Sequence, residues 1–87
     1  MFIFWFQKYS RAVLEVCSWK LGRYPQVQAF IQSDRPNKYP NLKVSYVRGK
    51  DPTLVLYDEN DDEVESLGID KWTTDTVEEY LNQIMGN

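Results

Sequence analysis

The sequence contains no histidine and a single cysteine, Cys17. Without an imidazole, the chain cannot assemble Ser-His-Asp or Cys-His nucleophilic machinery, which excludes most hydrolase mechanisms. One thiol cannot form an internal disulfide, so the fold is not stabilised by a disulfide within this sequence. One cysteine without histidine also makes zinc and haem sites improbable. We therefore expect no metal and no other cofactor.

The sequence also lacks a basic stripe and a long apolar run. Its 10 basic and 13 acidic residues give a formal net charge of −3, which argues against binding to nucleic-acid phosphates. The apolar residues 1–6 are too few for a signal peptide, follow no basic residue, and fall short of the ~20 residues that cross a bilayer. A membrane or partner contact is the alternative for this segment. We interpret residues 1–8 as an apolar N-terminal extension and expect no membrane partner.

Aromatic and other apolar residues are abundant: 15% of the chain is aromatic and 43% is hydrophobic. The 87 residues fit one domain. A domain of this size buries only about 60–65% of the surface that its unfolded chain exposes, so its core must be rich in large side chains. We expect residues 9–87 to form one domain and the protein to be a monomer.

The hydrophobic pattern predicts strands over residues 12–17, 43–48, 53–57 and 64–69. In the second strand, Val44 and Tyr46 are expected on one face. The third strand has no polar alternation, as expected for a strand covered on both faces. Residues 58–63 form an acidic turn between the last two strands.

Two helices complete the predicted pattern. The first begins at Pro25, whose missing N–H is harmless in the first turn of a helix. The second begins near a capping pair, Asp75 and Glu78. The predicted inward faces are Val27, Phe30 and Ile31 in the first helix, and Val77, Tyr80, Leu81 and Ile84 in the second.

The element order is therefore β-α-β-β-β-α. Its first unit requires parallel strands joined by a right-handed crossover, and the rest adds an antiparallel hairpin and a closing helix. The economical arrangement is an α/β fold with a four-stranded mixed sheet of order 4-3-1-2, which is the thioredoxin-like core. An antiparallel third strand beside the first would bring Cys17 and Pro52 to the same rim of the sheet.

Any redox chemistry of this chain is expected to centre on Cys17. It ends the first predicted strand, where backbone N–H groups and the nearby charges of Lys20 and Arg23 favour the reactive thiolate. A small buried hydrophobe is an equally good interpretation of a cysteine in this position. The position of Cys17 in the sequence does not by itself distinguish a reactive thiol from a buried structural cysteine.

A family resemblance adds to this interpretation. The run from Val13 to Val27, Val-Leu-Glu-Val-Cys-Ser-Trp-Lys-Leu-Gly-Arg-Tyr-Pro-Gln-Val, resembles the redox loop of the selenoprotein F and selenoprotein M family. The similarity continues through Tyr46–Pro52 and Asp70–Leu81 and spans roughly residues 9–85. In that family the loop reads Cys-Gly-Sec-Lys. By the resemblance, Cys17 matches the cysteine, Ser18 the glycine and Trp19 the selenocysteine.

The resemblance implies a thiol–disulfide oxidoreductase domain that acts on protein thiols in glycoprotein folding quality control, in the endoplasmic reticulum lumen. It implies that the active loop also contains Lys20, Gly22 and Arg23. For the full-length family it further implies a partner, the glycoprotein glucosyltransferase, held by a cysteine-rich segment that this sequence does not contain. We accordingly expect an excised domain or a short form.

Asp51-Pro52 resembles the turn that places a cis-proline against the active loop of thioredoxin-like proteins. We therefore expect a cis Asp51–Pro52 bond, although X–Pro bonds are cis in only about 5–6% of folded cases. In this interpretation both residues offer backbone groups to an extended substrate peptide beside Cys17, and so form a substrate groove.

Trp19 departs from the family pattern. Release of a mixed disulfide within one domain needs a second thiol or selenol, and an indole provides neither. We therefore expect an inactive or monothiol oxidoreductase, and we hypothesise that Trp19 is a substitution or readthrough product at a UGA codon. The alternatives are a non-catalytic thioredoxin-like module that binds peptides or proteins, and a purely structural subdomain.

Overall fold

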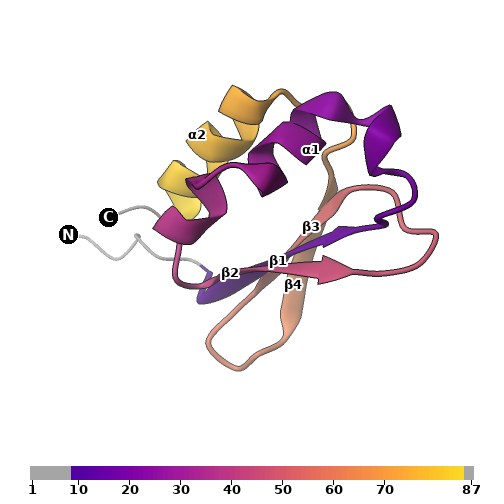
Figure 1. Ribbon diagram of the computed structural model, residues 1–87. Helices are drawn as coiled ribbons and strands as arrows, with labels where there is room; N and C mark the ends of the chain where they lie inside the picture. Colours follow the sequence, from indigo (N-terminus) through magenta and orange to yellow (C-terminus); the bar gives the residue numbers. More distant parts are fainter. Residues whose placement is uncertain (1–8, 86–87) are drawn as a thin grey trace.

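The computed structural model describes residues 9–85 and has two layers, a four-stranded sheet and a pair of helices that lie together on one of its faces (Figure 1). The strands are β1 (Arg11–Val16), β2 (Leu42–Tyr46), β3 (Thr53–Tyr57) and β4 (Glu63–Gly68), and the helices are α1 (Pro25–Gln32) and α2 (Thr74–Met85). Short 3-10 turns occupy Leu21–Arg23 and Arg35–Lys38. The predicted N-terminal extension, residues 1–8, lies outside the described residues.

The sheet has the order β2-β1-β3-β4, with β1 parallel to β2 and antiparallel to β3. The predicted thioredoxin-like α/β fold and its strand order 4-3-1-2 are therefore confirmed. The β3 strand has its predicted bounds, and the other strands begin one residue earlier than expected. No helix within residues 9–85 has the length and apolar character needed to cross a membrane.

The core lies between the sheet and the helices. Alternate residues of β1 and β3 face the helices and are buried: Ala12, Leu14, Val16, Leu54 and Leu56. The predicted inward faces of the helices meet them there, with Val27, Phe30, Val77 and Leu81 buried and Ile31, Tyr80 and Ile84 packed at the edge. Helical spacing predicts these positions in the helices, and the two-residue period of a strand places alternate residues of β1 and β3 on the face toward the helices.

Both helices of residues 9–85 lie on the same face of the sheet, so no helix of this part of the chain covers the opposite face (Figure 1). The middle of β3 is nevertheless buried on both faces, as expected, since Leu54, Val55 and Leu56 are all buried. On the face without helices Val55 is paired in register with Val13 of β1, and both are buried.

The start of α2 also differs from the prediction. The Thr73 hydroxyl oxygen accepts the N–H of Thr76 at 3.1 Å, so Thr73 caps the helix in place of the expected Asp75–Glu78 pair. Glu78 instead forms ion pairs with Arg35 at 3.1 Å and Lys38 at 2.9 Å. Thr73 and Asp75 are both of residue types that cap helices, and the sequence alone does not show which of them caps α2.

Candidate functional site

Cys17 directly follows β1, at a rim of the sheet where two loops meet. The β1–β3 register pairs Glu15 with Thr53, which places Cys17 at the same rim as Asp51 and Pro52. This juxtaposition was predicted from topology and is confirmed. The N–H of Val47 also donates to the Val16 carbonyl at 2.7 Å and so holds the loop after β2 against the end of β1.

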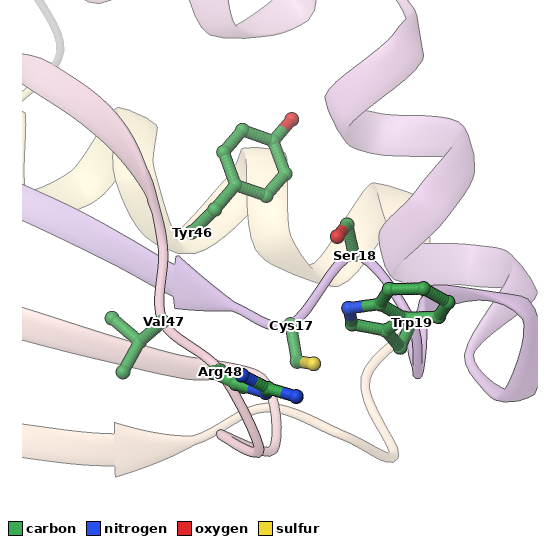
Figure 2. A pocket seen from close by; sticks show the side chains of 6 residues that line it. All are labelled: Cys17, Ser18, Trp19, Tyr46, Val47 and Arg48. Carbon is green, nitrogen blue, oxygen red and sulfur yellow. The ribbon is translucent and has the colours of Figure 1, made fainter.

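The Cys17 residue is 4% exposed, but it is not part of the hydrophobic core cluster. Two adjoining surface hollows, of about 290 Å³ and 370 Å³, both have Cys17, Trp19 and Arg48 in their walls. In Figure 2 the Cys17 sulfur points toward Arg48 and the Trp19 indole, whereas the Ser18 hydroxyl points away from it. Cys17 is therefore almost fully buried, but it borders two surface hollows.

Backbone donors surround the thiol. The pKa of Cys17 is lowered from its ordinary value, first by the Gly49 backbone N–H and then by the N–H groups of Trp19 and Lys20 and the charge of Lys20. Burial opposes this effect and raises the pKa, but the net shift is downward. The site thus favours the thiolate, the form of cysteine that attacks disulfides.

Gly49 can serve as a donor because of its backbone conformation. Its φ is +78°, in the left-handed region that residues with a Cβ rarely adopt. The turn at Gly49, in the loop after β2, thus lies against Cys17. Sequence reasoning did not assign Gly49 to the site, although a glycine directly after a strand was a visible signal.

Lys20 ties the loop after β1 to the loop before β3. Its ammonium group lies 3.1 Å from Asp51 Oδ1 and donates to the Gly49 carbonyl at 3.3 Å. The Tyr24 hydroxyl donates to the same Asp51 oxygen at 3.2 Å. The Lys20 ammonium, followed by the Tyr24 hydroxyl, holds the pKa of Asp51 below its usual value. Lys20 therefore acts on both the thiol and the neighbouring loop.

The predicted effect of Arg23 on the thiol has no counterpart in the structure. Arg23 and Gly22 are exposed in the 3-10 turn, and the charge of Arg23 lowers the pKa of Asp51, not that of Cys17. Ser18 is exposed as well. Of the predicted loop residues, Lys20 is thus the one whose side chain contributes to the electrostatics of Cys17.

The expected cis-proline is absent. Residues 9–85 contain no cis peptide bond, so the prediction for Asp51–Pro52 is wrong. The trans form is intrinsically favoured by about 0.5–1 kcal/mol at X–Pro bonds. The Pro52 side chain is buried, and its carbonyl accepts the N–H of Ile69 at 3.0 Å. A substrate groove at Asp51 and Pro52 stays a prediction, without the support that a cis bond would have given.

Three residues of the site were not predicted: Tyr46, Val47 and Arg48, which line the first hollow together with Cys17, Ser18 and Trp19. Val44 packs against the core as expected, whereas Tyr46 on the same face is 59% exposed. Strand alternation predicts the face of the sheet on which Tyr46 lies. It does not predict that this end of β2 extends beyond the core. Within residues 9–85, no group of three or more potential ligands could hold a metal ion.

Comparison with known proteins gives a consistent result. The family model described as "Sep15/SelM redox domain" matches residues 11–85. Selenoprotein F of Homo sapiens is 55% identical over 75 residues, which cover 86% of this chain and 46% of that protein. Selenoprotein M of Eriocheir sinensis is 33% identical over 73 residues, which cover 83% of this chain and 56% of that protein.

A solved structure is also similar. The solution structure of Sep15 from Drosophila melanogaster matches with a TM-score of 0.77 and 52% identity, covering 90% of this chain and 62% of that one. The chain spans about half the length of the selenoprotein F relatives that it matches.

Proposed function

The chain belongs to the Sep15/SelM redox domain family, and from this premise we propose that it exchanges disulfides with protein substrates through Cys17. The thiolate attacks one sulfur of a substrate disulfide. A new S–S bond joins Cys17 to the substrate, the old S–S bond breaks, and the second sulfur leaves as a thiolate with the bonding electrons. The observation that carries this proposal is the position of Cys17 at the rim of the sheet, where it borders a surface hollow and lies among backbone donors and Lys20.

Trp19 decides how far the reaction proceeds. We place it at the position where the family has selenocysteine, which makes this chain a monothiol form. The mixed disulfide then has no internal resolving group, because Cys17 is the single thiol of the sequence. An external thiol, such as glutathione, must attack it to release the substrate and regenerate Cys17. The complete two-thiol cycle within the domain is lost.

The first test measures the reaction of Cys17 with glutathione disulfide near neutral pH, followed by the intact mass of the protein. We expect the folded domain to form the mixed disulfide faster than the same chain in denaturant, because the folded site favours the thiolate. Cys17→Ser is the control and gains no mass. A thiol that reacts only after unfolding would contradict the proposal.

The second test restores a partner thiol at position 19. Trp19→Cys creates a Cys-x-Cys pair, which we expect to form an intramolecular disulfide on mild oxidation. The small ring is strained, so the bond should be relatively oxidising. Trp19→Ser is the matched control and retains one free thiol. Failure of Trp19→Cys to close this disulfide would show that position 19 does not present a second redox group to Cys17.

For the full-length protein we propose the cellular setting that the family resemblance implies: glycoprotein folding quality control in the endoplasmic reticulum lumen, with the glycoprotein glucosyltransferase as partner. The contact is assigned to a cysteine-rich segment and not to the residues described here, and the redox domain acts as a monomer. Purification of the glucosyltransferase with the full-length protein, and its loss when the cysteine-rich segment is deleted, is the expected result. Retention by the redox domain alone would contradict this assignment.

One observation favours a second function. Trp19 is 85% exposed beside the thiol, where a large aromatic side chain suits binding better than redox exchange. A non-catalytic module that binds peptides or proteins would use this side chain without electron transfer. A Cys17 thiol that is inert in the glutathione test, in a protein that still binds peptide, would favour this function over the first.

A further inference from the structure

Exposed apolar side chains cluster at one place on the domain. Within residues 9–85, the large hydrophobic residues that stand exposed are Trp19, Tyr46, Val47 and Val64. The first three of these line the hollow beside Cys17. In Figure 2 the Tyr46 and Trp19 rings lie on different sides of Cys17, and the Val47 side chain points away from the thiol. Single exposed apolar residues need no explanation, but a contiguous group of them marks an interaction site.

A basic side chain adjoins this apolar group. Arg48 lines both hollows beside Cys17 and is exposed. It forms no ion pair with another side chain within the described residues, whereas Lys20 is paired with Asp51 and Lys50 with Glu15. An unpaired guanidinium beside a reactive thiol, in a chain of net charge −3, is complementary to a carboxylate on whatever approaches Cys17.

We propose that Trp19, Tyr46, Val47 and Arg48 form a docking surface for one kind of occupant, an extended segment of a client polypeptide. The client cysteine carries an aromatic residue on one side, which packs on the Trp19 and Tyr46 rings, and an acidic residue on the other, which pairs with Arg48. This inference rests on the proposed exchange reaction of Cys17 and names the substrates that the reaction selects.

The edge position of β2 agrees with an extended occupant. β2 lies at one edge of the sheet, and its outer side pairs with no other strand of residues 9–85. Tyr46 ends this strand and Val47 follows it directly. Extended peptides bind at such edges because unpaired backbone groups provide hydrogen bonds while alternate side chains enter neighbouring hollows.

Selectivity among matched peptides tests this proposal. Three peptides carry the sequences Phe-Cys-Glu, Ser-Cys-Glu and Phe-Cys-Lys, each with its cysteine joined by a disulfide to thionitrobenzoate. Cys17 attacks the peptide sulfur, and the coloured thionitrobenzoate thiolate leaves with the electron pair. The rate for each peptide is divided by the rate for the mixed disulfide of thionitrobenzoate with mercaptoethanol, which reports the reactivity of the thiol alone.

We expect the ratio for Phe-Cys-Glu to exceed that for Ser-Cys-Glu about tenfold, as burial of an aromatic side chain predicts. It should exceed that for Phe-Cys-Lys about threefold, and this second preference should shrink at high salt. Tyr46→Ser should remove the aromatic preference and Arg48→Gln the acidic one. Val64→Ser is the matched control, because Val64 is 49% exposed on β4, and it should leave both preferences in place.

The outcomes separate this proposal from the exchange reaction on which it rests. Equal ratios for all three peptides, with a normal rate for the mercaptoethanol disulfide, would overturn the docking surface and leave the exchange reaction standing. Preferences that persist in Tyr46→Ser and Arg48→Gln would also overturn it. A thiol that reacts with none of the four disulfides would overturn the exchange reaction and the docking surface together.

Discussion

The two ends of the sheet differ in charge. The Cys17 end, made of residues 17–24 and 47–52, carries four basic side chains and one acidic side chain. The β3–β4 turn at the other end, residues 58–62, carries four acidic side chains and no basic one. The formal net charge of −3 therefore hides the opposite local charges of the two ends. A small acidic protein can thus present a locally basic surface. Here that surface surrounds Cys17, where it stabilises the thiolate and attracts the acidic side chain of the proposed client segment.

The two ends also use their charges differently. In the acidic turn, Asp58 Oδ1 accepts the N–H groups of Asn60 at 2.9 Å and Asp62 at 3.0 Å, and Asp61 pairs with Arg11 at 2.6 Å. Asp58 therefore shapes the turn itself, and Asp61 ties the turn to β1. At the Cys17 end, Arg48 is left available to a ligand. The acidic turn is therefore structural, and the Cys17 end is the one suited to recognition.

The largest expected effect comes from a change in the core that supports both ends. Phe30 of α1 is fully buried against the sheet, so Phe30→Ala should lower the free energy of unfolding by about 3–5 kcal/mol. Urea unfolding measures this loss, and Phe30→Leu provides a milder variant if the alanine variant does not fold. Val64→Ala, on the exposed surface of β4, should change stability by less than about 0.5 kcal/mol. Similar losses in both variants would contradict this picture of the core.

A glycine substitution should affect the Cys17 end alone. Gly49→Ala places a Cβ at φ +78°, which should cost about 1–2 kcal/mol in stability and displace the N–H that lowers the pKa of Cys17. Alkylation by iodoacetamide near neutral pH should become slower. Gly68→Ala is the control, because its Cβ would make an ordinary 3.7 Å contact and no positive φ is involved. An unchanged alkylation rate in Gly49→Ala would remove this N–H from the site.

A charge substitution should have a smaller effect on the same thiol. Lys20 lowers the pKa of Cys17, so Lys20→Gln should raise that pKa and reduce the thiolate fraction at any pH below it. We expect iodoacetamide to react about two- to fivefold more slowly near neutral pH, and the difference to vanish at high pH, where the thiol is ionised in both proteins. Lys43→Gln, on the exposed side of β2, is the control. Equal pH profiles for the wild type and Lys20→Gln would contradict the electrostatic role.

The smallest effect should appear at the acidic end and only in alkali. The Tyr9 hydroxyl donates to Glu65 at 2.5 Å, and this carboxylate together with burial raises the pKa of Tyr9 to about 12. Between the ordinary value near 10 and about 12, the unfolded chain loses this proton while the folded chain keeps it, so stability falls as pH rises. Tyr9→Phe should weaken this fall, as measured by urea unfolding from pH 9 to 11. A steeper fall in Tyr9→Phe would show that the sign is wrong.

The fold was predictable because its signals are local and repeated. A mostly apolar, β-branched run in β1, an uninterrupted apolar run in β3 and helical spacing after Pro25 each identify an element. The right-handed crossover between parallel strands then leaves few possible strand orders for the sheet. The charged β4 was the weakest of these signals. Its residues are almost all exposed, so only pairing with β3 shows that they form a strand.

The site was predictable only in part. Cys17 and Lys20 stand close together in the sequence, so their relation could be inferred from spacing. The contributions of Gly49 and Arg48 depend on how tightly the turn after β2 folds back, which no local pattern specifies. The state of the Asp51–Pro52 bond also depends on tertiary contacts, and the family-based expectation was wrong there.

The parallel pairing of β1 with β2 has a consequence for the timing of this chemistry. Cys17 precedes α1 in the chain, whereas the Gly49 N–H that favours its thiolate comes from the turn after β2. During synthesis the cysteine therefore emerges first, as an ordinary thiol with solvent around it. Its activated character arises only when the crossover closes and the later turn arrives. The lowered pKa of Cys17 is therefore a property of the folded domain, and residues 9–17 alone would not have it.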